Sequence, residues 1–292
     1  MIYVVIPVHN RKQYTRKCLA CLRDQTEQAH QVVVVDDGST DGTADMIQAE
    51  FPNVLVRMGT GSLWWAGGTN LGIQYVLDHL KSQPNDFLLT LNDDTEIAPN
   101  YLANLLNAYS AKQPCIIGSV SVDIREPGRL LYAGTHIDMS FAKIRDLAKT
   151  RFKQQQALLA TGPHYIPSDC LPGRGMLIPI SVFSKIGLLD ELHFQHHMAD
   201  LDFSIRARKA GFSLFVATNC VVYEHAEATG LALNKSTSIR QFLRALFTTR
   251  SPINLKTRYH FARIHAPAFL IYLTFDLARI FGGYVRRKLM ND

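Results

Sequence analysis

No run of apolar residues in the sequence is long enough to cross a membrane, and the sequence has neither an internal repeat nor a low-complexity tract. The five cysteines are odd in number and scattered, and Cys18 and Cys21 lack the second close pair that a zinc site needs. The first residues, MIYVVIPVHN, have no basic leader and are expected to form a strand, not a signal peptide. We therefore expect a cytoplasmic protein with reduced thiols.

The positive charge of the chain is concentrated near its end. The 292 residues carry a formal net charge of +6, yet residues 231–292 alone contain eleven Lys or Arg and only two Asp. The preceding 230 residues are therefore slightly acidic. With 47% hydrophobic and 19% charged residues, the composition is that of an ordinary globular protein. We expect a main domain over residues 1–230 and a basic, amphipathic helical tail over residues 231–292.

Short apolar runs rich in β-branched residues alternate with stretches of helical periodicity in the first 112 residues. The apolar runs predict strands over residues 2–8, 31–35, 53–57 and 87–91. The other stretches predict helices over residues 12–25, 41–51, 69–81 and 99–111. Alternation of this kind predicts an α/β fold in which a mostly parallel central sheet is flanked by helices.

The pattern is weaker after residue 112. Short strands are expected at VSVDI and THIDM, and a helix over residues 200–210 is followed by a strand at FSLFVA. From residue 231 onward the sequence is basic, aromatic and helix-like, which predicts a C-terminal helical extension.

Acidic residues follow two of the predicted strands at the point where each strand ends. Asp36 and Asp37 end the second strand, and Asn92, Asp93 and Asp94 follow the strand at 87–91. In a parallel sheet the carboxyl ends of the strands share one edge, and ligands bind there. We therefore expect these carboxylates to face a ligand cleft, where a positive partner offsets the cost of placing them side by side.

Six motifs occur in order along the chain: IPVHNR, VVVVDDGSTDGT, LWWAGGTNLGI, LNDDT, PGRGMLIPISVFSKIGLLDE and ADLDFSIRARKAGF. Together they resemble glycosyltransferase family 2. The resemblance covers roughly residues 1–230 and implies the GT-A fold and a nucleotide-activated sugar donor. It further implies a nucleotide-binding half over about residues 1–112 and an acceptor-binding half over about 113–230.

By this resemblance, NDDT is the D-x-D-type metal motif of the family. Asp94 stands at its final acidic position, and Asn92 replaces the Asp often found at the first. The implied cofactor is Mg²⁺ or Mn²⁺, hard cations that bind carboxylate oxygens and diphosphate. His225, after the last predicted strand, is implied as a second metal ligand. The structural alternatives are a helix cap for Asp93 and a surface position for His225.

The resemblance also implies the residues that bind the nucleotide-sugar. Two adjacent tryptophans of an extended segment cannot face the same core, so one of them, Trp65, is expected to line the cleft. Thr69 stands where the family often has Arg, which removes a charged phosphate contact. The expected donor-binding residues are Pro7, His9, Asp36, Asp37, Trp65, Gly68, Asn70 and Asp93.

Asp200 matches the position of the family's general base. It would accept the proton of the acceptor hydroxyl as that oxygen attacks the anomeric carbon, which inverts the configuration. Ala199 replaces the usual preceding Glu, and helix capping is the alternative role of Asp200. The residues implied on the acceptor side are Gly173, Arg174, Gly175 and Asp202.

The tail mixes Lys and Arg with large apolar residues. APAFLIYLTFDLARIFGGYVRRKL suits a helix in the membrane interface, with Arg286, Arg287 and Lys288 on anionic headgroups. This fits a lipid-linked acceptor and a peripheral position on the inner face of the cell membrane. The alternatives are a helix packed on the main domain or a dimer contact. Deleting residues 264–292 is expected to abolish membrane binding and to leave the fold intact.

We expect an inverting, metal-dependent transferase with a UDP- or dTDP-linked donor and a growing cell-surface glycan or lipid-linked acceptor. The WWAGG sequence is similar to that of rhamnosyltransferase-like members that build bacterial surface polysaccharides. One rival, a sugar nucleotidyltransferase, would need glycines after the first strand, which PVHNRKQY lacks. Another is a catalytically silent binding protein, which Ala199 and Asn92 favour. A nucleic-acid partner is not expected, and the H-x-x-H-H cluster at 193–197 is too short to supply four zinc ligands.

Overall fold

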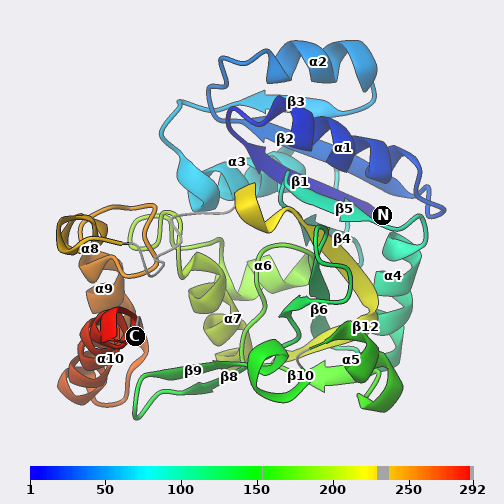
Figure 1. Ribbon diagram of the computed structural model, residues 1–292. Helices are drawn as coiled ribbons and strands as arrows, with labels where there is room; N and C mark the ends of the chain where they lie inside the picture. Colours follow the sequence, from blue (N-terminus) through cyan, green and yellow to red (C-terminus); the bar gives the residue numbers. More distant parts are fainter. Residues whose placement is uncertain (153, 229–236, 290–292) are drawn as a thin grey trace.

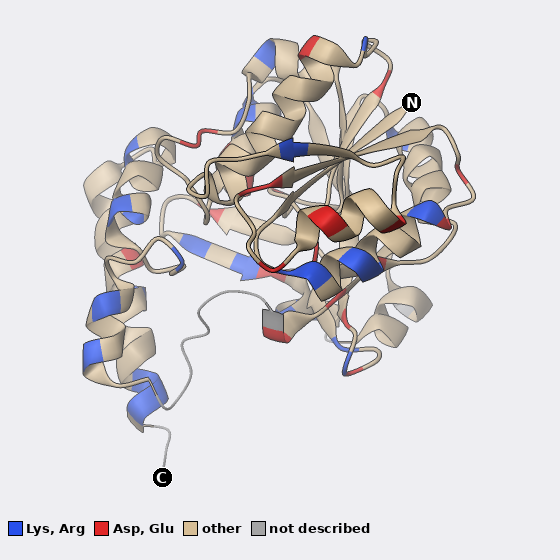
Figure 2. Cartoon of the chain, turned by 90° about the horizontal axis from the view of Figure 1, so that it is seen from above, with Lys and Arg blue, Asp and Glu red and all other residues tan. Residues whose placement is uncertain are grey.

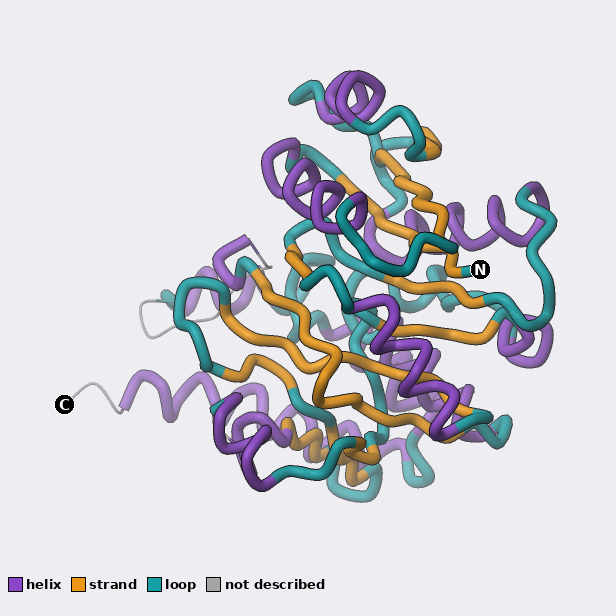
Figure 3. Tube along the Cα trace, turned by 90° about the vertical axis from the view of Figure 1, so that its right-hand side faces the viewer, coloured by secondary structure: helices purple, strands orange, loops and turns teal. Residues whose placement is uncertain are grey.

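A computed structural model describes residues 1–152, 154–228 and 237–289. Its centre is a ten-stranded mixed sheet with the strand order β10-β12-β6-β11-β4-β1-β2-β3, in which β5 pairs with β12 and β7 with β6. Helices cover both faces of this sheet (Figures 1 and 3). The predicted α/β fold is confirmed.

The first half of the sheet is parallel, as predicted. Its four neighbouring strands are β3 (Leu55–Met58), β2 (His30–Asp36), β1 (Ile2–Val8) and β4 (Phe87–Thr90). Alternate residues of β1 enter the cores on opposite faces, with Val4 and Ile6 in one core and Tyr3 and Val5 in the other. This strand is therefore buried on both sides, which explains its continuous apolar sequence.

The helices of the nucleotide half are divided between the two faces. The face of Val4 and Ile6 is covered by α1 (Lys12–Arg23), α2 (Thr43–Glu50) and α4 (Tyr101–Lys112). The face of Tyr3 and Val5 is covered by α3 (Trp64–His79). Cys18 and Cys21 lie on α1, and all five cysteines of the chain are free.

The second half of the sheet mixes parallel and antiparallel strands. The long strands β6 (Cys115–Asp123) and β12 (Ser213–Glu224) are parallel to each other, while β11 (Met176–Pro179) runs antiparallel between β6 and β4. Every residue of β6 is buried. The predictions at VSVDI and FSLFVA located parts of β6 and β12 but made both strands too short, because polar residues such as Ser119, Ser121 and Thr218 are also buried.

Shorter elements complete the main domain. The remaining strands are β5 (Thr95–Ile97), β7 (Leu130–Tyr132), β10 (Tyr165–Pro167) and the separate hairpin of β8 (Thr135–Asp138) and β9 (Lys143–Asp146). The remaining helices are a π-helical turn (Ala148–Phe152), α5 (Gln155–Thr161), α6 (Ser181–Ile186), α7 (Ala199–Lys209) and a 3₁₀ turn (Ala226–Ala228). Asp200 lies in the first turn of α7, close to where the sequence predicts that helix to start.

Helix α3 begins five residues earlier than the sequence predicts. The carboxylate of Asp37 accepts hydrogen bonds from the backbone N–H groups of Leu63 and Trp64, which satisfies donors at the start of the helix. The glycines of WWAGG are therefore helical. A Cβ at Gly72 would lie 2.4 Å from a methyl carbon of Val5, so this glycine permits close contact between α3 and β1. The premise that the two tryptophans belong to an extended segment was wrong.

The tail forms three helices beside α7, namely α8 (Ile239–Ala245), α9 (Leu255–His265) and α10 (Phe269–Leu289) (Figure 1, left). Phe261 of α9 and Tyr272 of α10 enter the same core as Phe203 of α7. Lys and Arg residues are distributed along the length of these helices (Figure 2, blue). Deleting residues 264–292 would remove Tyr272 from this core and His265 from Asp202, which argues against survival of the fold, and the expected outcome of the deletion stays a prediction.

None of the helices within the described ranges is long and apolar enough to cross a membrane.

Candidate active site

The two acidic pairs lie at one edge of the sheet, as the sequence predicts. Strand β1 separates β2 from β4 and is parallel to both, so Asp36 and Asp37 share this edge with Asp93 and Asp94. All four carboxylate residues are buried. Each carboxylate therefore needs a partner within the protein or in a ligand.

The first acidic pair is bound by backbone N–H groups. Asp37 Oδ1 accepts a hydrogen bond from Gly61 N at 2.7 Å, and Oδ2 accepts one from Leu63 N at 2.8 Å. Asp36 Oδ1 accepts from Ser39 N at 2.8 Å. His9 lies next to them, with Nδ1 2.7 Å from the carbonyl oxygen of Asp37. This pair thus fixes the loop that leads into α3, and its nucleotide-binding role stays a prediction.

The second acidic pair is bound by a guanidinium group. Arg11 Nη1 lies 2.8 Å from Asp94 Oδ2 and 3.2 Å from Asp93 Oδ1. Burial raises the pKa of Asp93 to about 7, although Arg11 acts to lower it and Asp94 raises it further. The positive partner expected for this pair is thus Arg11, which belongs to the quoted motif IPVHNR but was not among the predicted site residues.

Asn92, which replaces the Asp often found at the first position of the metal motif, forms a hydrogen bond with a tryptophan. Trp65 Nε1 donates a hydrogen bond to Asn92 Oδ1 at 3.0 Å. The ring of Trp65 reaches Gly173, where an added Cβ would lie 2.0 Å from a ring carbon. Gly173 is therefore required by contact with Trp65. Gly68 has a similar function in α3, since an added Cβ would lie 3.0 Å from Cβ of Pro7. The structure thus brings Trp65 and Gly173 together at the site.

The carboxylates of Asp93 and Asp94 fit a hard divalent cation. Both offer hard oxygen donors, and Asp93 Oδ2 is buried without a hydrogen-bond partner. The ring of His225 is directed elsewhere, with Nε2 2.9 Å from Glu96 Oε1 and Nδ1 3.4 Å from Glu227 Oε1. Among the residues that the structure describes, no group of three or more His, Cys, Asp or Glu side chains is arranged to hold a metal ion. The metal role of His225 stays a prediction.

Asp200 is held at the start of α7 by two backbone donors. Its Oδ2 accepts from Gly173 N at 3.3 Å, and its Oδ1 accepts from its neighbour Leu201 N at 2.9 Å. Burial raises the pKa of Asp200 above its ordinary value, and the charge of Arg174 limits this increase. The carboxylate thus combines a fixed position with increased basicity.

Arg174 lies among the acidic groups of the site. Its Nε pairs with Glu224 and donates to Ser121 Oγ at 3.2 Å. Burial alone lowers the pKa of Arg174, but the charges of Glu224, Asp200 and Asp94 raise it above its ordinary value. Arg174 thus stabilises both the carboxylate of Asp200 and the end of β12. Glu224 was missed by sequence reasoning, although it directly precedes the predicted site residue His225.

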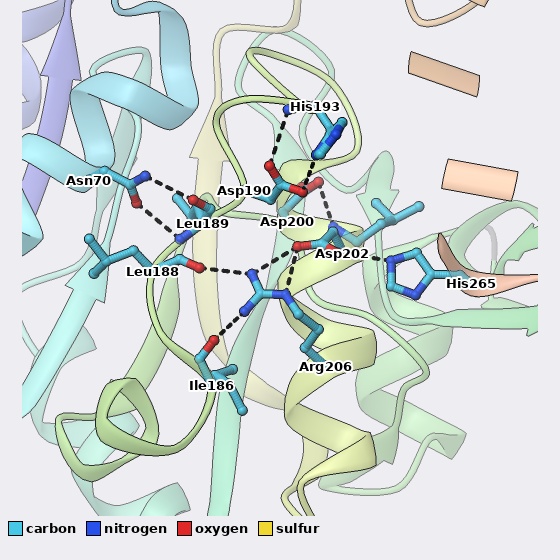
Figure 4. A network of polar contacts seen from close by, with 11 residues as sticks. Asn70, Ile186, Leu188, Leu189, Asp190, His193, Asp200, Asp202, Arg206 and His265 are labelled. Atoms are coloured by element: carbon cyan, nitrogen blue, oxygen red, sulfur yellow. Dashed lines mark hydrogen bonds and ion pairs between the residues drawn. The ribbon is translucent and has the colours of Figure 1, made fainter. Parts of the chain in front are cut away.

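Asp202 is bound on both sides by cationic or imidazole groups (Figure 4). His265 Nε2 lies 2.9 Å from its Oδ1, and Arg206 Nε donates to its Oδ2 at 2.8 Å. Burial alone raises the pKa of Asp202, but these two contacts lower it below its ordinary value. Asp202 thus connects α7 to α9 of the tail, and its acceptor-binding role stays a prediction.

The same network fixes the segment before α7 (Figure 4). Arg206 donates to the carbonyl oxygens of Ile186 at 2.6 Å and Leu188 at 2.8 Å. Asn70 of α3 exchanges hydrogen bonds with the backbone of Leu189 and donates to Glu191 Oε2 at 2.8 Å. The Asn70 amide is therefore used to join α3 to this segment, and its contact with a nucleotide stays a prediction.

Comparison with known proteins identifies the family. The family model described as "Glycosyl transferase family 2" matches residues 3–176, more than half of the chain. The chain belongs to glycosyltransferase family 2. This glycosyltransferase depends on a nucleotide-sugar donor, and the matched residues include both acidic pairs and the loop of Gly173, Arg174 and Gly175.

Curated relatives are similar over most of the transferase. An N-acetylglucosaminyl-diphospho-decaprenol L-rhamnosyltransferase of Mycobacterium tuberculosis is 28% identical over 241 residues, which cover 78% of this chain and 77% of the relative. An uncharacterized glycosyltransferase of Rickettsia typhi is 25% identical over 239 residues, covering 80% of this chain and 68% of that protein.

Solved structures confirm the GT-A fold of the transferase. GalNAc-T7 with UDP, GalNAc and Mn²⁺ matches with a TM-score of 0.60 and 16% identity over 97% of this chain, which spans 55% of GalNAc-T7. The mannosyltransferase PcManGT of Pyrobaculum calidifontis, in complex with GDP-Man and Mn²⁺, matches with a TM-score of 0.57 and 13% identity over 98% of this chain and 71% of that one.

Proposed function

We propose that the protein is an inverting transferase that moves a sugar from a UDP- or dTDP-linked donor to a hydroxyl group of a lipid-linked or growing cell-surface glycan. The observation that carries the proposal is the position of Asp200, a partly buried carboxylate at the start of a helix, beside Arg174 and the Gly173 loop. Asp94, at the carboxyl edge of the sheet, is assigned to the donor side. The proposal thus gives the two carboxylates different functions, with Asp200 as the base and Asp94 as a donor-binding group.

In the proposed reaction Asp200 takes the proton of the acceptor hydroxyl group while the oxygen attacks the anomeric carbon. A base must be ionised and close to the proton that it accepts. Arg174 favours the ionised form of Asp200, and burial increases its basicity. The N–H groups of Gly173 and Leu201 fix the carboxylate at the start of α7, next to the loop proposed for the acceptor.

On the donor side, Asp93 and Asp94 would hold Mg²⁺ or Mn²⁺, which supplies positive charge to the diphosphate leaving group. The chain's own residues position the rest of the donor in this proposal. Pro7, His9, Asp36 and Asp37 form the nucleotide end, and Trp65, fixed by Asn92, forms the sugar end of the site. The loop of Gly173 to Gly175 forms the acceptor side.

A lipid-linked acceptor is supported by the tail and by a relative. The mycobacterial relative is named for an acceptor in which N-acetylglucosamine is linked by diphosphate to decaprenol. In the tail, Phe247, Leu270 and Leu289 have exposed fractions of 77%, 72% and 73%. Basic residues accompany them, among them Arg286 and Lys288. We propose that this outer surface rests on an anionic membrane.

The substitution Asp200→Asn tests the base. We expect sugar transfer to fall by at least about a thousandfold, because the proton acceptor is lost, while donor affinity stays within about twofold. In the wild type the rate should increase with pH through a pKa above the ordinary carboxyl range. Proton NMR of the product should show inversion at the anomeric carbon. Unchanged turnover in the variant, or retention of configuration, would reject this mechanism.

Replacing Phe247, Leu270 and Leu289 together by Gln tests the membrane surface. We expect the variant to lose sedimentation with phosphatidylglycerol vesicles, because apolar insertion and charge attraction act together. Leu159→Gln on α5, also an exposed apolar residue, is the matched control and should bind as the wild type does. Equal sedimentation of the triple variant and the wild type would exclude this surface.

A further inference from the structure

The tail contacts the main domain at residues on both sides of Asp200 in the sequence. After Asp200 in the chain, Asp202 is bound by His265 of α9, and both side chains are almost completely buried. Before it, His197 Nε2 lies 3.1 Å from the carbonyl oxygen of Arg250, in the loop between α8 and α9. The tail therefore contributes to the packing that positions Asp200.

The loop that carries Arg250 has a fixed conformation. Ser251 and Ile253 are buried, and Leu255 N donates to the carbonyl oxygen of Leu246 at 2.8 Å, which closes the loop. The guanidinium of Arg258 donates twice to the carbonyl oxygen of Pro252, at 3.0 and 2.8 Å, and also pairs with Asp276 of α10. The backbone of Arg250 is thus held from both the main domain and the tail.

The side chain of Arg250 is exposed at the rim of the active site. Its guanidinium carbon lies 5.7 Å from the centre of the Trp64 ring, a cation–π arrangement that directs the group. Trp64 precedes Trp65, which contacts Gly173 of the acceptor loop. The ring of His196 lies 6.0 Å from that of Trp64. Burial, His197, Arg11 and Arg250 together lower the pKa of His196 to about 4, so this imidazole is neutral beside the two arginines.

Apolar groups continue outward from this cation. Phe247 is three residues before Arg250 and is 77% exposed, and Leu243 and Ile239 on α8 are also exposed. A ligand extending from the catalytic cleft would therefore meet a cation first and an apolar surface next. A sugar linked through diphosphate to a polyprenyl chain has its groups in this order.

We infer that Arg250 binds the diphosphate of a lipid-linked acceptor and that the exposed apolar side chains of α8 receive the first part of its lipid. The inference rests on the proposed function and names the acceptor class of the same site. Guanidinium groups bind phosphate oxygens through two parallel hydrogen bonds, which makes Arg250 a determinant of acceptor specificity.

The test measures binding without sugar transfer. Full-length protein in EDTA is titrated calorimetrically with geranyl diphosphate and with inorganic diphosphate. We expect Arg250→Ala to weaken geranyl diphosphate binding by about tenfold or more, and Arg250→Lys by less, because a charge-assisted contact is lost. Arg263→Ala, which removes an exposed cation of α9, should stay within about twofold. Inorganic diphosphate should bind more weakly than geranyl diphosphate.

Two outcomes of this titration would reject the inference. Wild-type affinity in Arg250→Ala would show that this residue does not contact the ligand. Equal losses in Arg250→Ala and Arg263→Ala would mean diffuse charge attraction. A protein that binds geranyl diphosphate through Arg250 but transfers no sugar would reject the proposed function and leave this inference standing. Circular dichroism spectra and melting temperatures establish that each variant is folded.

Discussion

Two pairs of adjacent aspartates follow strands β2 and β4 at the same edge of the sheet, yet the protein compensates their negative charge differently. Asp36 and Asp37 accept hydrogen bonds from backbone N–H groups of the loops that follow them. Asp93 and Asp94 instead pair with the side chain of Arg11, whose exposed fraction is 32%. The first pair is bound by backbone groups, and the second by a side chain that is partly exposed.

This difference indicates that the first pair has a structural role, whereas the positive partner of the second pair can be replaced by another cation. Backbone donors fix Asp37 and thereby the start of α3. The guanidinium of Arg11 can be replaced by another positive charge without unfolding a loop, since it reaches the pair from a partly exposed side chain. A cation-binding role is therefore expected for the second pair and a framework role for the first.

The largest effect is expected from Asp94→Ala. We predict that UDP or dTDP binding in the presence of Mn²⁺ falls by at least about a hundredfold, because the metal loses its main carboxylate. The melting temperature should change little, since Arg11 still pairs with Asp93. Calorimetric titration of the nucleotide, with and without Mn²⁺, measures the effect. Metal-dependent binding that survives in this variant would refute the assignment of the second pair.

Asp37→Ala should show the opposite pattern. Three backbone N–H groups lose their acceptor, so the free energy of unfolding should fall by about 2–4 kcal/mol. Urea unfolding followed by circular dichroism provides the measurement. Asp45→Ala, at an exposed position in the first turn of α2, is the control and should cost only a few tenths of a kcal/mol. If both substitutions cost the same, the first pair is not structural.

The smallest predicted effect is the pH dependence of Asp93. Its pKa is about 7 in the folded protein, above the ordinary value of 3.8, so folding favours the protonated form, and this stability is lost as the pH rises toward 7. The advantage of Asp93→Asn over the wild type should therefore grow by about 2.5 kcal/mol between pH 5 and pH 8. Urea unfolding in EDTA at both pH values tests this, with Asp45→Asn as the control. A constant difference would contradict the raised pKa.

Local sequence was sufficient to predict the parallel half of the sheet. The apolar runs at β1, β2 and β4 and the acids that follow them come from neighbouring residues, and all three strands formed where expected. The start of α3 could not be predicted in this way, since it depends on Asp37, which is 26 residues before Leu63.

The partners within the site are separated even further in sequence. Arg11 lies 83 residues before Asp94, and His265 lies 63 residues after Asp202. No local spacing reports such contacts, because they form only when distant elements pack together. The tail shows most clearly what local sequence cannot predict. Its basic and apolar composition predicted an outer surface, but its buried contacts with α7 could be found only in the three-dimensional structure.

The hairpin of β8 and β9 adds a third support for the tail. Arg279 of α10 donates to the carbonyl oxygens of Phe141 and Ala142 at the hairpin turn, and Phe275 packs edge-on against Phe141. The tail thus contacts the main domain at Asp202 of α7, at His197 and at this turn. If the tail rests on a bilayer as proposed, these contacts would hold the proposed active site at a fixed height above the headgroups. That height would limit which sugar of a lipid-linked glycan the enzyme can extend.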